Sequence, residues 1–201
     1  MAGKILVSTA YLPPVEYFSL VKRSDKVFIE REENYLKQTW RNRCNILSAH
    51  GIQKLTVPVY LGSIHKTPVK DIRIDYSKRW QQVHLRAMTA SYNAAPYFEF
   101  YFETIQKVIL NNHNFLLDLN LELTESVLKI LKIENDILYT TEYEPDMNND
   151  YDFRYRISPK KISDYNIKKY SQVFIVNEGF LPGLSIIDLV FNMGPEASYY
   201  L

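Results

Sequence analysis

The sequence contains one cysteine and very few glycines. Cys44 has no second cysteine to pair with, so the chain can form neither an internal disulfide nor a multi-thiolate metal site. The six glycines are scattered, and none belongs to a phosphate-binding loop or a dinucleotide fingerprint. The four histidines include no pair at metal-ligand spacing, and no serine has the flanking glycines of a hydrolase elbow. The sequence therefore predicts neither a metal site nor a cofactor.

Excess charge and long apolar runs are also missing. The 24 Lys and Arg residues nearly balance the 23 Asp and Glu residues, which gives a formal net charge of +1. Nucleic-acid binding needs a clear basic excess, so nucleic acid is not an expected partner. No apolar run approaches the roughly 18 residues of a membrane span, and no charged-then-apolar leader precedes Lys4. We therefore expect a cytoplasmic protein without a transmembrane segment.

Apolar residues and tyrosines are plentiful. The hydrophobic fraction of 46% and charged fraction of 23% are typical of a soluble globular protein. A length of 201 residues predicts one domain, 1–201, with a substantial core. The 16 tyrosines combine an apolar ring with a polar tip. They suit a wet cleft that holds a polar ligand, and they suit the periphery of a core equally well.

The N-terminal residues predict a β-α-β unit. A strand is expected over 4–10, a short helix over 14–23 and a second strand over 25–30. A crossover of this size favours parallel strands, and ligands of open α/β sheets bind beyond the carboxyl ends of such strands. The residues expected to line that crevice are Tyr11, Pro13 and Glu30.

Further strands and three helices are expected in the middle of the chain. Residues 53–60 predict a strand in which Pro58 marks an edge or an interruption, and 69–75 alternate as a strand does. A helical layer over 77–132 follows. Its helices are Trp80–Ser91, Phe98–Ile109 and Leu116–Leu131. We expect an α/β fold, with α+β as the alternative, in which a mixed or mainly parallel sheet carries this inserted helical layer.

The C-terminal third alternates short elements with polar segments. Residues 137–143 predict a strand, 144–165 a long polar loop and 173–176 a short buried strand. Ser185 to Asp188 has capping-box spacing ahead of a helix that Gly194 ends.

The stretch 37–45 holds the densest group of candidate ligand-binding side chains. Arginine forks make paired hydrogen bonds to phosphate or carboxylate, and a tryptophan can stack on a base or sugar ring. The stretch therefore predicts a small anionic or sugar-containing ligand. Alternatively, the tryptophan anchors the core, the arginines pair with the glutamates at 30, 32 and 33, and residues 44 and 46 continue an amphipathic turn. The candidates are Lys37, Trp40, Arg41, Asn42 and Arg43.

Two residues are candidates for proton transfer. His84 lies four residues after Trp80 and eight before Tyr92, so on a helix it can face a cleft beside aromatic rings as a general base. Its alternative is a structural role. Glu30 shares a strand face with Glu32, and together they suit a carboxylate pair or a divalent ion, with an ion pair to a nearby arginine as the alternative.

Two weaker candidates have simple structural alternatives. Asp146, Asp150 and Asp152 can collect a cation or form a solvated acidic loop. Cys44 lies among cations that can lower the pKa of its thiol, and a buried, inert thiol is the alternative.

Six blocks of sequence span nearly the whole chain. They are Tyr11–Phe18, Lys37–Arg43, Leu55–Val59, Trp80–His84, Tyr92 with Ala95–Phe98, and Leu184–Leu189. Together, and in this order, they resemble the WbqC-like family, which is associated with bacterial surface polysaccharides, notably O-antigen. The chain departs from the usual His-Gln-Pro motif at 9–11 and from the usual paired aspartates at 30–32.

The resemblance implies an enzyme of surface-polysaccharide biosynthesis. It would act on a nucleotide sugar or transfer an acyl or aminoacyl group to an amino sugar. Tyr92 and Tyr97 join the expected substrate-binding residues. In this mechanism Arg41 and Arg43 hold phosphate or carboxylate, Lys37 adds charge, Trp40 or Tyr97 stacks on a ring, and Glu30 or His84 moves a proton.

A non-catalytic binding or scaffold protein of the same pathway is the alternative function. The departures from the family pattern favour it, because they remove a candidate acid, base or ligand contact. A homo-oligomer and a protein partner from the pathway are both compatible with this sequence.

Overall fold

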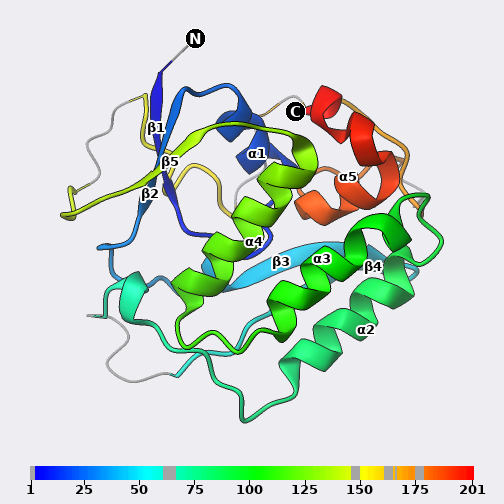
Figure 1. The fold of residues 1–201 in the computed structure, drawn as a ribbon, viewed down its shortest axis with the longest axis horizontal. Helices are drawn as coiled ribbons and strands as arrows, with labels where there is room; N and C mark the ends of the chain where they lie inside the picture. The colour runs from blue at the N-terminus through cyan, green and yellow to red at the C-terminus, as the bar shows by residue number, and fades with distance from the viewer. Residues whose placement is uncertain (1–2, 61–66, 146–149, 161–164, 166, 175–178) are drawn as a thin grey trace.

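A computed structural model describes residues 3–60, 67–145, 150–160, 165, 167–174 and 179–201. The N-terminal residues form the predicted β-α-β unit from β1 (Lys4–Ser8), α1 (Val15–Lys22) and β2 (Lys26–Glu30). The two strands are parallel, and β5 (Asp136–Tyr139) joins the other edge of β2, also in parallel. The resulting sheet has the order β1-β2-β5 (Figure 1). The α/β class is thus confirmed.

A separate antiparallel hairpin follows, made of β3 (Arg43–Ser48) and β4 (Gly51–Thr56). Gly51 has φ of 98°, a turn conformation that glycine adopts without strain. The sequence predicted a strand over 53–60, but β4 ends before Pro58, which has no N–H to donate to a ladder. The amphipathic turn at 44–46 was wrong: these residues are in β3, where Cys44 and Ile46 are buried.

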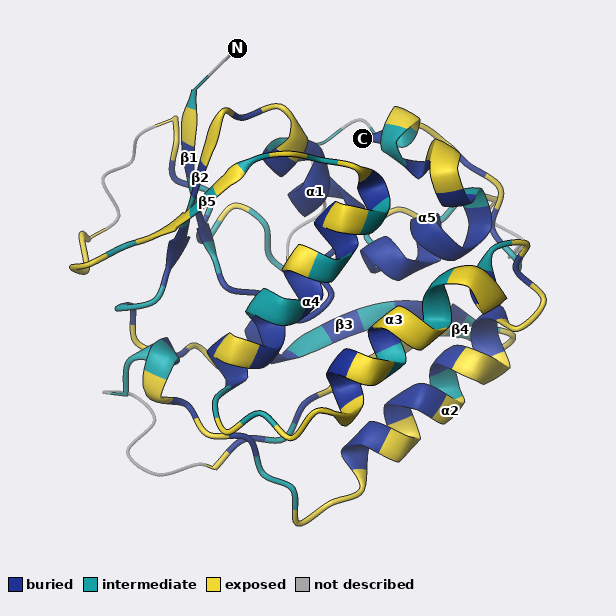
Figure 2. Ribbon diagram, viewed as in Figure 1, coloured by how far each residue is buried: buried dark blue, intermediate teal, exposed yellow. Residues whose placement is uncertain are grey.

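The helical layer is confirmed. It consists of α2 (Trp80–Tyr92), α3 (Phe98–Leu110) and α4 (Leu116–Leu131). Helix α3 packs against both α2 and α4, and α2 packs against β3 (Figure 1). In Figure 2 each of these helices is buried along one side and exposed along the other, as the helical spacing of their apolar residues requires.

The C-terminal elements close the core. Helix α5 (Ile186–Met193) begins at Ser185, whose side chain accepts a hydrogen bond from the Ile187 N–H, and η4 (Gly194–Tyr200) follows. Gly194 has a positive φ, and a Cβ there would approach the Tyr97 ring to 2.4 Å. One cluster of buried apolar residues extends from β1 through the helical layer to these last elements.

The strand predicted over 69–75 was wrong. Residues Val69–Asp71 form a 3-10 helix, η3, and single bridges then join Ile74 to Val59 and Arg73 to Phe115. Ile72 and Ile74 are buried as expected, while Arg73 is exposed. The alternation reflects one-sided burial, and among the described residues these are isolated bridges and not a continuous ladder.

The late segments partly lie outside the described residues. Of the predicted loop 144–165, the described residues belong to no helix or strand, although Leu6 exchanges backbone hydrogen bonds with Tyr151 and Phe153. The strand predicted over 173–176 was wrong at 173–174, and 175–176 lie outside the described ranges. No helix in the described part of the chain has both the length and the apolarity needed to cross a bilayer.

Candidate functional site

Buried ion pairs occupy the carboxyl end of the parallel sheet. Arg154 donates to both carboxylate oxygens of Asp152 and, through Nη1, to Glu30 Oε2 at 3.0 Å. The side chains of Arg154 and Glu30 are fully buried. Burial raises the pKa of Asp152, but the hydrogen bonds and charge of Arg154 outweigh this effect and the pKa is lowered. Glu30 is thus held in an ion pair with Arg154.

A second buried pair lies beside the first. Arg41, in the 3-10 turn η1 (Trp40–Asn42), donates through Nε and Nη2 to the two Glu33 oxygens at 2.8 and 2.6 Å, and also to Ser8 Oγ. The Arg41 and Glu33 side chains are 3% and 1% exposed. Desolvation raises the pKa of Glu33 more than Arg41 lowers it. The guanidinium of Arg41 is therefore engaged in a bidentate contact inside the protein.

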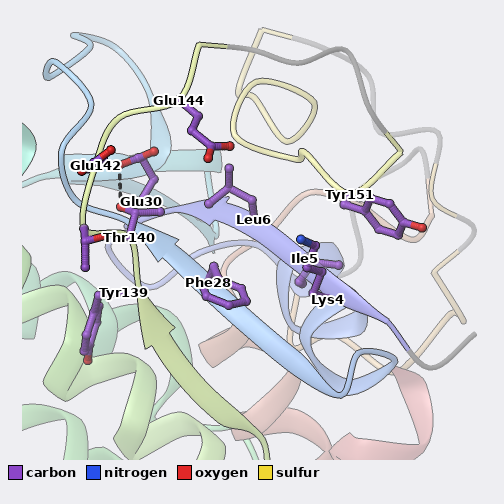
Figure 3. A pocket seen from close by; sticks show the side chains of 11 residues that line it. Lys4, Ile5, Leu6, Phe28, Glu30, Tyr139, Thr140, Glu142, Glu144 and Tyr151 are labelled. Carbon is purple, nitrogen blue, oxygen red and sulfur yellow. Dashed lines mark hydrogen bonds between the residues drawn. The ribbon is translucent and has the colours of Figure 1, made fainter.

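An open cleft of about 510 Å³ adjoins this end of the sheet. Its floor includes Leu6 and Phe28, and Glu30 accepts a 2.7 Å hydrogen bond from Thr140 Oγ1 at one end of the cleft (Figure 3). Glu142 and Glu144 add negative charge beside Glu30 (Figure 3). This sheet-end cleft is consequently unfavourable for the anionic ligand that the sequence predicts.

A different cavity of about 510 Å³ lies beside the hairpin, and we call it the hairpin groove. It includes three of the predicted binding residues, Lys37, Asn42 and Arg43, and it adds Lys78. Asp75 is the acidic residue in its lining. Tyr35 and Tyr60 contribute aromatic rings. The groove thus combines excess positive charge with the amphipathic rings that suit a polar, ring-containing ligand.

Arg43 is the first residue of β3 and pairs directly with Thr56 of β4. Its Nε is buried without a hydrogen-bond partner, and its guanidinium forms no ion pair with the residues that the structure describes. The preceding residue, Asn42, donates through Nδ2 to the Val57 carbonyl, while its buried Oδ1 has no hydrogen-bond partner among the described residues. Unpartnered buried polar atoms cost about 1–3 kcal/mol each, so their presence here needs an explanation.

Tyr35 keeps its proton in the groove. Burial raises the pKa of its phenol to about 12, and the positive charges of Arg43 and Arg41 only partly oppose the effect. Its hydroxyl group is therefore neutral at physiological pH. It can both donate and accept a hydrogen bond.

His84 lies in an adjoining cavity of about 420 Å³, which we call the α2 cleft. Its Nδ1 is 2.9 Å from the Tyr11 hydroxyl, and its ring packs on Trp80. Burial lowers the pKa of His84 to about 4, although a hydrogen bond to the Thr56 backbone acts in the opposite direction. His84 is thus neutral at pH 7, and its pKa lies well below the range expected of a general base acting near neutral pH.

The other predicted residues lie apart from the groove. Tyr11 is fully buried under His84, and the Pro13 carbonyl accepts from the Ile186 N–H at the start of α5. Tyr92 is buried where its hydroxyl accepts from the Leu47 N–H. Trp40 borders a small cavity of about 20 Å³ together with Arg41. Tyr97 packs against Gly194.

Two weaker candidates also have structural surroundings. Asp152 is paired with Arg154, Asp150 has an oxygen 4.0 Å from Arg156, and Asp146 lies outside the described residues. Burial raises the pKa of the Cys44 thiol. Cys44 is therefore a buried thiol, as in the second of its two interpretations.

Sequence reasoning missed several residues of the groove. Tyr35, Thr56, Asp75 and Lys78 line it, and they come from segments up to about forty residues apart in the chain. Only Tyr35 lies next to the predicted stretch. Its position two residues before Lys37 is the one local signal that could have found it.

The fold and the groove define an α/β protein with a cationic cavity beside an antiparallel hairpin. The chain belongs to the WbqC-like protein family, whose model matches residues 9–160 and 146–200. The protein "Uncharacterized protein Rv1507c" of Mycobacterium tuberculosis is 27% identical over 222 aligned residues, which cover 98% of this chain and 96% of that protein. No solved structure shows a significant match to the chain.

Proposed function

We propose that residues 1–201, as one WbqC-like domain, bind a small anionic, sugar-containing ligand in the hairpin groove. The observation that carries this proposal is the guanidinium of Arg43, which has no ion-pair partner among the described residues and lines the groove together with Lys37 and Lys78. A cavity of about 510 Å³ is within the roughly 300–1,000 Å³ typical of small-molecule sites. Arginine is the side chain best suited to a planar, two-point contact with phosphate or carboxylate.

In this proposal each polar or aromatic group of the groove has a role in binding the ligand. Arg43 holds a phosphate or carboxylate, and Lys37 and Lys78 add attraction from either side. Tyr35 and Tyr60 contact a ring, and the neutral Tyr35 hydroxyl bonds to a sugar hydroxyl. These are binding and orienting roles, which can supply a large part of the acceleration in a group transfer.

The chain belongs to the WbqC-like family, and from the association of this family with bacterial surface polysaccharides we propose an enzyme of their biosynthesis, of the O-antigen type. In this proposal it acts on a nucleotide sugar or transfers an acyl or aminoacyl group to an amino sugar. The side chains of Glu30 and His84 are both buried and hydrogen-bonded. Proton transfer is therefore carried out by a group of the ligand, or by Glu30 or His84 after a rearrangement.

A thermal-shift screen tests the binding step. The probes are nucleotide sugars, free nucleotides, acyl-coenzyme A compounds and inorganic phosphate. A ligand at one hundred times its Kd stabilises the native state by about 2.7 kcal/mol, which raises the Tm by several degrees. We expect a shift with a nucleotide sugar that disappears in Arg43→Gln and remains in Lys129→Gln, an exposed lysine on α4. An equal shift in Arg43→Gln would contradict the assignment.

A non-catalytic binding or scaffold protein of the same pathway is the second candidate. The observation that favours it is the separation of the two proton-transfer candidates: Glu30 lines the sheet-end cleft and His84 lines the α2 cleft. Co-purification with pathway proteins, followed by light scattering, distinguishes the two. A stable complex without turnover of a bound nucleotide sugar supports the scaffold, and turnover supports the enzyme.

A further inference from the structure

The hairpin groove and the α2 cleft are neighbours with a common wall. Thr56, Pro58 and Lys78 line both cavities. The register of the hairpin explains why. Arg43 lies opposite Thr56, and Lys54 is two residues before Thr56, so the three side chains lie on one face of β3 and β4. The two cavities thus meet at this face of the hairpin, and the α2 cleft also takes Gln53 and Leu55 from the other face of β4.

Positive charge is concentrated in the lining of the two cavities. Among the described residues, five cationic side chains line them, against the single carboxylate of Asp75, in a chain whose net charge is only +1. Among the residues that the structure describes, none of the five forms an ion pair. A cleft of one sign of charge attracts and concentrates ligands of the opposite sign. The five are Lys37, Arg43, Lys54, Lys78 and Arg79.

The start of helix α2 adds to this attraction. Lys78, Arg79 and Trp80 line the α2 cleft, and the helix begins at Trp80. The N-cap residue, Arg79, makes no side-chain capping hydrogen bond, and the first turn contains no acidic residue. The Trp80 N–H donates to the Lys78 carbonyl, and the positive end of the helix dipole favours an anion. Trp80 is 4% exposed, and its Nε1–H has no partner in the described part of the chain.

We infer that the groove and the cleft form one two-part site for a ligand with two linked anionic groups, such as the diphosphate of a nucleoside diphosphate sugar. This inference rests on the proposed function and specifies its ligand. Arg43 and Lys37 hold the first phosphate in the groove. Lys78, between the two cavities, and Arg79 hold the second.

The rest of the ligand extends along the walls. Leu55, Val83 and the edge of Trp80 give the α2 cleft an apolar side, and Val83 is 58% exposed. The groove offers the hydroxyl groups of Tyr35 and Tyr60 instead. A base therefore suits the α2 cleft and a sugar suits the groove, because bases present an apolar face and sugars present hydroxyl groups.

Calorimetric titration of the full chain with uridine monophosphate, uridine diphosphate and inorganic pyrophosphate tests this inference. We expect the diphosphate to bind about tenfold or more tightly than the monophosphate, since a second charge-assisted contact contributes about 1.5–3 kcal/mol. Arg43→Gln should abolish this preference, because the phosphate of the monophosphate lies next to the base, at Lys78 and Arg79, whereas Lys78→Gln and Arg79→Gln should weaken both nucleotides. Lys129→Gln should change neither.

The outcomes separate the inference from the proposed function. Equal affinities for the two nucleotides, with both lost in Arg43→Gln, would retain the groove as a site and overturn the two-part site. Affinities that stay unchanged in Arg43→Gln, or no binding of any probe, would overturn both the two-part site and the proposed function. A single-stranded oligonucleotide that binds the same face more tightly than the diphosphate would overturn the assignment to a small molecule.

Discussion

Arg41 and Arg43 are two residues apart, and their surroundings are opposite. Arg41 is buried and makes a bidentate pair with Glu33, close to the second buried pair of Arg154 with Glu30 and Asp152. Arg43 forms no ion pair with any described residue and borders an open groove. The same side chain thus serves the fold at one position and remains available to a ligand at the other.

The sheet end and the hairpin groove also differ in the free energy needed to keep their charged groups in place. At the end of the parallel sheet, desolvation raises the pKa of Glu33 in spite of Arg41. Burying this pair therefore costs free energy, and removing one partner would leave the other charge buried and unpaired. Along the hairpin, the exposed lysines Lys37, Lys54 and Lys78 remain in water and cost little. Stability should therefore depend on Arg41, and ligand affinity should depend on Arg43.

Arg41→Ala should give the largest effect on stability. It leaves the Glu33 carboxylate buried without its partner, and breaking such a pair costs about 3–5 kcal/mol. Urea unfolding followed by circular dichroism measures the loss. The matched change Arg43→Ala should cost less than about 1 kcal/mol, because its guanidinium has no partner to lose. Equal losses in the two variants would remove the distinction between the arginines.

The protonation of His84 should change the free energy of unfolding by nearly as much. Its pKa is about 4 in the folded protein and near 6.5 unfolded, so its contribution to stability is present above pH 6.5 and is lost as the pH falls toward 4. The loss amounts to about 3 kcal/mol. The stability of wild type relative to His84→Gln, which cannot titrate there, should fall by this amount between pH 7.5 and 4. A constant difference would show that His84 is not desolvated.

The sequence predicted the elements that periodicity and turn chemistry encode. The β-α-β unit and the three helices of the layer follow from the spacing of apolar residues, and Ser185 and Gly194 mark the ends of α5. The strand at 43–48 was missed because Arg43, Asn45 and Ser48 alternate with the buried residues in a stretch that looks like a polar binding segment. Local pattern could not tell a half-buried strand from a turn.

The sequence could not predict which of the two arginines pairs with a glutamate. Pairing with glutamates and contact with a ligand were both open for Arg41 and Arg43. Arg41 pairs with Glu33, and Arg43 pairs with no glutamate among the described residues, while its contact with a ligand stays a prediction. The difference depends on where Glu33 lies and on the register that sets Arg43 opposite Thr56, which are features of the tertiary structure. Lys78 reaches the groove in the same way, from a segment distant in the chain.

Salt should change the Kd of a ligand in the groove but not the stability supplied by the buried pair. This effect should be smaller than those of Arg41→Ala and of His84 protonation. Between 50 and 500 mM NaCl, the Kd of a diphosphate at the exposed cations should rise several-fold, because the Debye length falls from about 14 to about 4 Å. The buried pair of Arg41 and Glu33 is shielded from ions, so the free energy of unfolding lost in Arg41→Ala should stay within about 1 kcal/mol. Calorimetry and urea unfolding measure the two quantities. A salt-independent Kd would place the ligand away from the exposed cations.

Asp75→Asn should produce the smallest change. Asp75 is the one carboxylate that lines the hairpin groove, and it opposes an anionic ligand. Its replacement should tighten diphosphate binding by about two- to fivefold, the range expected for a single solvent-screened charge. Asp118→Asn, on the exposed side of α4, is the matched control and should have no effect. Weaker binding in Asp75→Asn would instead make Asp75 a ligand contact.

The most direct test of the division between Arg41 and Arg43 is the affinity of Arg43→Gln for uridine diphosphate, measured by calorimetry on protein whose Tm has been recorded. We expect the Kd to rise about tenfold or more while the Tm stays within about 2 °C of wild type, because in our proposal Arg43 binds the ligand, and it forms no ion pair with a described residue. A wild-type Kd in this folded variant would contradict the assignment of the hairpin groove as the binding site.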